Sequence, residues 1–231
     1  MLAPEDIKKA LGKYAAGLVP PNSTIGLGTG TTVYWLIKEL SLRIKDGLAI
    51  KAVPTSNATR KLAADAGIIL VGLNDIDSIS LTIDGADEID PQLQLIKGGG
   101  GALLQEKMVA AASRQLLIIA DESKFVGQLG LFPLPVEVIP NGWKQVKKKI
   151  ADLGCDRVAL RLSNNLPCFT DNGHYILDCD FRSITDPGAL NISLHLIPGV
   201  VETGLFINMA NSVILGYADG RIEIKEKTTA Q

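Results

Sequence analysis

The sequence predicts an α/β protein with a doubly wound, mostly parallel sheet and a smaller, inserted ferredoxin-like α+β domain. The first observation is that short β-branched runs alternate with helix-period stretches through the first half of the chain, which is typical of parallel sheets. The second is that the order changes after residue 132 to β-α-β-β-α-β, the split arrangement of ferredoxin-like domains.

The first half opens with a predicted helix over 4–17, in which Ile7, Leu11 and Tyr14 share one face. Strands and helices then alternate. The predicted elements are a strand over 23–27, a helix over 33–42, a strand over 49–53, a helix over 58–66, strands over 68–72 and 79–83, a helix over 102–114 and a strand over 116–120.

The inserted domain begins where a proline-rich segment, Phe132-Pro133-Leu134-Pro135, changes the composition. Its predicted elements are a strand over 136–139, a helix over 143–153, strands over 157–162 and 175–180, a helix over 187–195 and a strand over 200–205. A hairpin over 212–217 and 221–224 returns to the main sheet. We expect a Rossmann-like main domain of residues 1–131 and 206–231, and an inserted domain of residues 132–205 that serves domain packing or subunit contact.

The composition is that of a globular protein without a strongly charged partner. The chain has 231 residues, of which 46% are hydrophobic, and a net charge of −2. This near-neutral charge argues against nucleic acid as a partner, and the run Lys147-Lys148-Lys149 is typical of a solvated helix face. No segment approaches the ~18 consecutive apolar residues of a membrane helix. We expect a cytoplasmic protein that does not contact a membrane.

Cysteines and histidines offer no pattern for a metal site. Cys155, Cys168 and Cys179 are odd in number and have no C-x-x-C spacing, and His174 and His195 are the only histidines. We expect reduced cysteines that pack in the interior, with neither metal nor cofactor.

Chemistry-bearing residues concentrate in one stretch, LTIDGADEIDPQLQLIKGGGGALLQEKM, over 81–108. The run Asp84-Gly85-Ala86-Asp87 directly follows a predicted strand, where open α/β sheets bind ligands. Lys97 precedes four glycines, Gly98 to Gly101, whose apolar flanks are unlike those of a flexible linker. Successive backbone N–H groups at a helix start bind anions, so we interpret this segment as an anion-stabilising loop.

Glu106 is the candidate base of this stretch. The positions three and four residues away, which include Leu103 and Val109, are apolar, so the carboxylate projects from the apolar stripe of a helix. Burial raises the pKa of a carboxylate toward the range useful to a general base.

A second candidate loop, Gly28-Thr29-Gly30-Thr31-Thr32, joins a predicted strand to a helix. Small residues, hydroxyls and a helix N-terminus together make a phosphate cradle. The third glycine of a dinucleotide fingerprint is missing, because Thr31 and Val33 occupy its two possible positions, and the Walker pattern is absent. A phosphate monoester therefore fits this loop better than NAD or ATP. Lys124, after the predicted strand 116–120, is a further candidate phosphate contact.

The segments GLGTGTT, TIDGADEID and KGGGGALLQEK, taken in this order, make the sequence similar to the type A ribose-5-phosphate isomerases, and the likeness spans essentially the whole chain. The resemblance implies a cytoplasmic homodimer or higher homo-oligomer that interconverts ribose 5-phosphate and ribulose 5-phosphate without metal or cofactor. Thr31, where we expect serine, and Gly101, where alanine is common, are slight departures.

The resemblance also implies roles for particular residues. Glu106 matches the catalytic base, and Asp84, Asp87 and Lys97 match polar active-site residues. The implied substrate-binding residues are Thr29, Gly30, Thr31, Thr32, Gly85, Ala86, Gly98, Gly99, Gly100, Lys124 and Lys8.

Aldose–ketose isomerisation needs a base that moves a proton between C2 and C1, together with donors that stabilise an enediolate oxygen. Glu106 would supply the base, and Lys97 with the glycine-loop N–H groups the donors. Either Asp84 or Asp87 would assist ring opening. Two other classes remain open: a phosphosugar-binding regulator without turnover, and a coenzyme A transferase or glucosamine-phosphate deaminase on a similar sheet.

Overall fold

The computed structural model describes residues 1–227, which fold as two compact units. The first unit contains residues 1–86, 105–124 and the chain from Met209 on. The second contains residues 87–104 and 125–208. Each unit has its own hydrophobic core.

The first unit is built on a seven-stranded sheet of order β16-β15-β7-β4-β1-β2-β3. All neighbours are parallel except β15 and β16, the hairpin expected at the end of the chain. If the six parallel strands are numbered one to six by their order along the chain, their order across the sheet is 3-2-1-4-5-6, which is that of a doubly wound fold. The strands are β1 (Ser23–Leu27), β2 (Ile50–Pro54), β3 (Ile69–Leu70), β4 (Leu81–Asp84), β7 (Leu116–Asp121), β15 (Ser212–Gly216) and β16 (Ile222–Glu226). The mostly parallel α/β fold expected from the sequence is confirmed.

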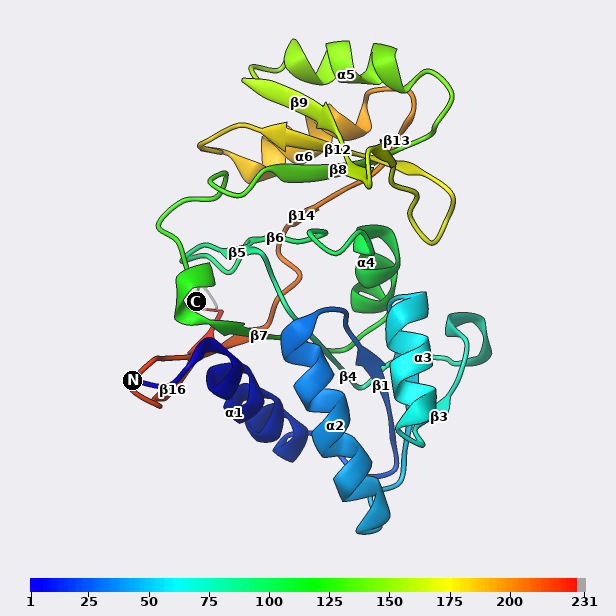
Figure 1. Ribbon diagram of the computed structural model, residues 1–231, viewed down its shortest axis with the longest axis vertical. Helices are drawn as coiled ribbons and strands as arrows, with labels where there is room; N and C mark the ends of the chain where they lie inside the picture. The colour runs from blue at the N-terminus through cyan, green and yellow to red at the C-terminus, as the bar shows by residue number, and fades with distance from the viewer. Residues whose placement is uncertain (228–231) are drawn as a thin grey trace. The chain divides into compact units, whose positions relative to one another are not determined.

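Helices cover both faces of this sheet. α1 (Pro4–Gly17), α2 (Thr31–Lys45) and α3 (Asn57–Asp65) lie along one face (Figure 1), where Leu11, Leu36 and Ala63 are buried in one core cluster. Gly12 lets α1 approach α2 closely, because a Cβ at this position would lie 2.6 Å from the Leu36 backbone nitrogen. On the other side, Val109 of α4 (Leu103–Ala111) packs in a separate cluster with Val53 and Ile79.

The second unit contains an antiparallel sheet of order β13-β8-β12-β9. Its strands and helices follow the expected β-α-β-β-α-β order: β8 (Leu134–Val138), α5 (Trp143–Ala151), β9 (Arg157–Leu160), β12 (Tyr175–Asp180), α6 (Pro187–His195) and β13 (Val200–Thr203). Strand alternation buries Val136 and Leu177 against Ile150 and Leu194 of the two helices. The intervening residues of the strands, such as Pro135, Ile176 and Asp178, therefore face away from the helices.

Several short elements were not expected from the sequence. β5 (Glu88–Ile89), β6 (Leu95–Ile96) and β14 (Leu205–Phe206) form a three-stranded antiparallel sheet, and β10 (Leu162–Ser163) pairs with β11 (Leu166–Pro167). The 3₁₀ turns η1 (Leu73–Asp75) and η2 (Glu122–Lys124) complete the fold. Because β14 pairs with β6, residues 87–104 belong to the second unit, and the unit boundaries differ from those expected at residues 132 and 205.

The three cysteines are free thiols, and Cys168 is only half-buried. Cys155 and Cys179 are buried, and a hydrogen bond with Cys155 together with burial raises the pKa of the Cys179 thiol. Among the described residues, none of the helices has the length and apolar character that crossing a bilayer requires.

Candidate active site

The carboxyl ends of four neighbouring parallel strands, β2, β1, β4 and β7, lie along one edge of the first unit's sheet. Chain order reverses between β1 and β4, so this is the topological switch point at which doubly wound sheets bind ligands. The loops after these strands carry Thr29, Thr55, Gly85 and Lys124. The fold thus gathers residues from four separate segments at one edge.

Asp84 fixes the junction between the loops after β1 and β4. Its side chain is 1% exposed, and its Oδ1 accepts hydrogen bonds from the Thr29 N–H at 3.1 Å and the Gly85 N–H at 2.7 Å. Gly28 makes room for it, because a Cβ at residue 28 would lie 2.1 Å from that oxygen. The carboxylate therefore orders both loops through their backbones.

The helix that follows this loop begins directly at the candidate phosphate residues. Gly30 precedes α2 with φ 121° and ψ 178°, a conformation essentially restricted to glycine. Thr31 and Thr32 form the first turn of α2, where backbone N–H groups lack helical acceptors and the helix dipole favours an anion. This local geometry fits the phosphate cradle that the sequence predicted.

A cluster of four hydroxyls supports the cradle, and three of its members were missed by sequence reasoning. The Thr29 Oγ1 lies 2.8 Å from the hydroxyls of Thr55 and Ser56 and 3.1 Å from that of Thr59. The Thr59 hydroxyl also donates to the Gly28 carbonyl oxygen at 2.8 Å. Thr55, Ser56 and Thr59 are all buried. The missed signal was the polar run Thr55-Ser56 directly after β2, the strand that neighbours β1.

A pocket of about 380 Å³ opens beside this cluster, lined by Thr29, Gly30, Thr31 and Thr59 together with residues of α2 and α3. Glu5 of α1 also lines it, and the Lys8 Nζ lies 3.7 Å from a carboxylate oxygen of Glu5. Lys8 is therefore near the pocket but forms an ion pair within its own helix.

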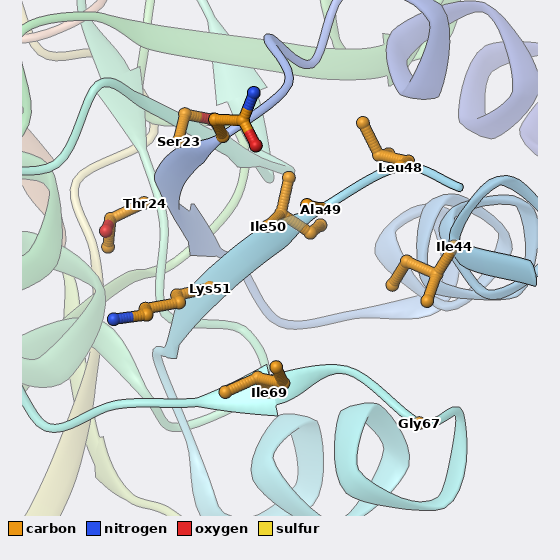
Figure 2. A pocket seen from close by; sticks show the side chains of 10 residues that line it. Ser23, Thr24, Ile44, Leu48, Ala49, Ile50, Lys51, Gly67 and Ile69 are labelled. Atoms are coloured by element: carbon orange, nitrogen blue, oxygen red, sulfur yellow. The ribbon is translucent and has the colours of Figure 1, made fainter.

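Another pocket of about 380 Å³ lies at the opposite edge of the same sheet, beside the amino ends of β1, β2 and β3. Figure 2 shows apolar side chains such as Ile44, Leu48 and Ile69 around it. None of the residues predicted for the site lines it.

Glu106 and Lys124 are the remaining predicted site residues of the first unit. Glu106 lies in the first turn of α4 and is only 4% exposed, and its helix neighbours Val109 and Ala110 are buried, so the predicted core-facing orientation is consistent with its burial. Lys124 is half-buried at the end of η2, immediately after β7.

The second unit holds the glycine loop. Gly98 and Gly101 have φ of 99° and 81°, which glycine adopts without strain. The Gly101 N–H donates to the Gly98 carbonyl at 3.0 Å and closes the turn. The Gly99 N–H donates to Asp87 Oδ2 at 2.8 Å. Two of the four glycine N–H groups are thus engaged within the protein.

Lys97 is a buried lysine, 3% exposed, and its backbone N–H donates to the Gly204 carbonyl at 2.9 Å. Its Nζ lies 5.4 Å from the centre of the Phe206 ring. Arg161, which the sequence did not single out, donates to the carbonyl oxygens of Gly98 and Gly99. The second unit thus brings together Asp87, Lys97 and the glycine loop.

Each unit accordingly assembles its own share of the predicted residues. The first contains Thr29 to Thr32, Asp84 to Ala86, Glu106 and Lys124, and the second contains Asp87 and Lys97 to Gly100. Within residues 1–227, no group of three or more His, Cys, Asp or Glu side chains is arranged to hold a metal ion. The fold and these residues define an α/β protein of the doubly wound class, with a glycine-containing loop in each unit.

Comparison with known proteins identifies the family. The sequence profile of ribose 5-phosphate isomerase A (phosphoriboisomerase A) matches residues 51–220. A ribose-5-phosphate isomerase A of Bacillus cereus is 59% identical over 95% of this chain and 100% of its own length, and one of Cereibacter sphaeroides is 45% identical over 100% and 91%. The solved ribose 5-phosphate isomerase of Plasmodium falciparum is 36% identical, covers 97% of this chain and 100% of its own, and superposes with a TM-score of 0.94.

The chain belongs to the ribose-5-phosphate isomerase A family. It is an isomerase that interconverts ribose 5-phosphate and ribulose 5-phosphate, a reaction of the pentose phosphate pathway. Family membership favours this activity over the regulator, transferase and deaminase alternatives.

Proposed function

We propose that the isomerisation proceeds through an enediolate, with Glu106 as the base that carries the proton. In the aldose-to-ketose direction the Glu106 carboxylate takes the proton from C2 and returns it to C1. The C1 carbonyl oxygen becomes negatively charged in the enediolate and then takes up the proton that the C2 hydroxyl gives up as it becomes the new carbonyl. The single observation that carries this assignment is the burial of Glu106 in the first turn of α4, at the position that matches the family's base. A carboxylate removed from water is a stronger proton acceptor than one in solution.

The developing negative charge needs donors that are already in place. Lys97 and the backbone N–H groups of the glycine loop are the donors we propose, and each preorganised donor is worth about 3–4 kcal/mol in comparable enzymes. The solved structure of a 37% identical ribose-5-phosphate isomerase is in complex with phospho-erythronic acid, whose planar anionic carboxylate resembles an enediolate and so supports an intermediate of this kind.

Substrate opening and binding follow from the remaining residues. Asp84 or Asp87 moves the hydroxyl proton during ring opening. Thr31, Thr32 and Lys124 bind the phosphate, and Thr29 and Gly30 shape the cradle. Gly85, Ala86 and Lys8 contribute further substrate contacts.

We also propose that the enzyme works without metal or cofactor, as a cytoplasmic homodimer or higher homo-oligomer, and that the β-α-β-β-α-β part of the second unit is a ferredoxin-like domain. The family resemblance supports the first two statements, and the strand order β13-β8-β12-β9 supports the third.

Replacing Glu106 with Gln tests the proposed base. The change removes the proton acceptor while nearly preserving volume, so kcat should fall by at least about 10²–10⁴-fold with the fold retained. During turnover in D₂O the unmodified enzyme should place deuterium at C1 and C2 of the sugar phosphates, and the variant should not. Exchange near the unmodified rate in Glu106→Gln would assign the base to another carboxylate, with Asp84 and Asp87 the next candidates.

A further inference from the structure

Arg161 lies in the second unit, between β9 and β10, and its guanidinium is held in one orientation by Asp178 of β12. Nε donates to Asp178 Oδ2 at 3.0 Å, and Nη2 donates to Oδ1. The side chains of Arg161 and Asp178 are 16% and 27% exposed. This two-bond arrangement matches the fixed fork of a guanidinium to a carboxylate and leaves Nη1 directed elsewhere.

The remaining nitrogen binds the glycine loop. Nη1 donates to the carbonyl oxygens of Gly98 at 2.8 Å and Gly99 at 3.1 Å. One rigid side chain therefore holds two consecutive peptide groups of a segment that consists of glycine only. Glycine has the greatest conformational freedom of all residues, so the loop's own sequence supplies little that would fix these peptides.

Holding the carbonyls also determines where the N–H groups point. In a planar trans peptide the C=O and the following N–H are directed oppositely. With the Gly98 and Gly99 carbonyls on Arg161, the N–H groups of Gly99 and Gly100 face away from the guanidinium. The first of them donates to Asp87 Oδ2 at 2.8 Å. The second donates to no acceptor among residues 1–227, and Gly100 is exposed.

We propose that Arg161, held by Asp178, is a positioning residue for the isomerase reaction, which orients the Gly99 N–H toward Asp87 and the Gly100 N–H toward the enediolate oxygen. This role rests on the proposed enediolate mechanism, but Arg161 itself does not touch the substrate. It makes the glycine loop a preorganised donor before the negative charge develops, and such preorganisation affects the transition state more than substrate binding.

The test compares Arg161→Gln with Arg182→Gln. Arg182 forms an exposed ion pair with Asp156 in the same unit, whereas within residues 1–227 the guanidinium that donates to the Gly98 and Gly99 carbonyls is that of Arg161, so Arg182→Gln controls for loss of a guanidinium. Arg161→Gln should lower kcat on the order of 10²-fold, the effect of losing one oxyanion donor, with KM changed by less than about 3-fold. Arg161→Lys should show a smaller loss, because an ammonium group donates to carbonyls without the fork to Asp178. Arg182→Gln should match the unmodified enzyme.

Ligand binding gives a second readout that does not need turnover. We expect calorimetry to show that Arg161→Gln weakens the binding of phospho-erythronate, because its carboxylate needs the oriented donor. The affinity for ribitol 5-phosphate, which has no planar anion at that end, should not change. The proposal would be overturned if Arg161→Gln weakened the binding of both ligands equally, or if the folded variant had a kcat within about 2-fold of the unmodified value. If Arg161→Gln does not fold, Arg161→Lys undergoes the same comparison.

The two measurements also separate this proposal from the proposed mechanism. If Glu106→Gln retained exchange, the base assignment would fail while selective loss of phospho-erythronate binding in Arg161→Gln still supported the positioning role. If the base assignment stood and the two ligands weakened equally, only the positioning role would fail.

Discussion

The hydroxyl-rich cradle of the first unit and the glycine loop of the second are both backbone segments that we propose bind anions, but they are held in different ways. In the cradle, Thr29 is fixed by the hydroxyls of Thr55, Ser56 and Thr59, which come from the neighbouring strand end and helix start of a parallel sheet. In the glycine loop, Gly98 and Gly99 are held by Arg161, 62–63 residues away along the chain.

The difference shows what each loop depends on. The cradle is supported by several short hydrogen bonds, so the loss of one leaves others in place. The two glycine-loop carbonyls share one guanidinium, so the loss of that group removes a hydrogen bond from both peptides at once and, within residues 1–227, leaves only the Gly101 N–H on the Gly98 carbonyl and Asp87 on the Gly99 N–H. We therefore expect the cradle to respond to mutation in graded steps and the glycine loop to respond to the loss of one distant residue.

The largest contrast is expected between two matched glycine substitutions. A Cβ at residue 28 would lie 2.1 Å from Asp84 Oδ1 and 2.6 Å from the Asp84 Cα, so backbone must move. Gly28→Ala should lower the free energy of unfolding by about 1–3 kcal/mol. It should also lower kcat/KM about 10²-fold, because a displacement of about 1 Å in an active site reduces the rate by this much. Thermal melts and steady-state kinetics measure both.

Gly99→Ala is the matched control in the other loop. A Cβ there would lie 2.6 Å from Asp87 Oδ1, but this is the end of a side chain that can rotate, and Gly99 is exposed. Its effect on stability should stay within about 0.5 kcal/mol, although displacement of Asp87 will lower kcat. A melting temperature lowered more by Gly99→Ala than by Gly28→Ala would contradict the idea that the cradle is the more tightly packed of the two.

The same contrast explains how far the sequence could predict this protein. The doubly wound sheet, the loop that joins β1 to α2 and the buried position of Glu106 could be predicted because each depends on the periodicity or turn residues of one short segment. The hydroxyls of Thr55 and Thr59 and the guanidinium of Arg161 were not, because their roles depend on which strand ends become neighbours. The small sheet of β5, β6 and β14 was missed for a related reason, since two-residue strands carry no readable alternation.

Lys124→Ala should have the next largest effect, on KM rather than kcat. A hydrogen bond to a charged group contributes about 1.5–3 kcal/mol, so losing a phosphate contact should raise KM for ribose 5-phosphate about 10–100-fold. Phosphate contacts are remote from C1 and C2 and therefore contribute mostly uniform binding. Lys148→Ala, an exposed lysine of α5, is the control and should change neither constant. Unchanged KM, or a fall confined to kcat, would remove Lys124 from the phosphate site.

Two threonine substitutions test whether the hydroxyl cluster around Thr29 affects substrate binding or only stability. Thr59 bonds to Thr29, Ser56 and the Gly28 carbonyl, whereas Thr170 of the second unit donates to Glu137 at 2.9 Å. Each change to valine should cost about 1–2 kcal/mol, because a buried partner loses its hydrogen bond. Only Thr59→Val should also raise KM, by a few fold, because it loosens Thr29. If Thr170→Val raised KM equally, the hydroxyl cluster would have no particular connection to substrate binding.

The smallest expected effect is that of metal removal, for which we expect none. In the second unit the two histidines are already engaged, His174 with Glu137 and His195 with Glu202, each at 2.9 Å, so neither nitrogen–carboxylate pair is arranged around an ion. Metal sites need three or four converging ligands, and no such group occurs in the described part of the chain. Activity after dialysis against EDTA should therefore equal that of untreated enzyme, and added Mg²⁺, Mn²⁺ or Zn²⁺ should not raise it. Loss of turnover in the chelator, restored by one of these ions, would mean that an ion rather than the glycine loop and Lys97 stabilises the enediolate charge. The glycine loop would then not have the donor role that we propose for it.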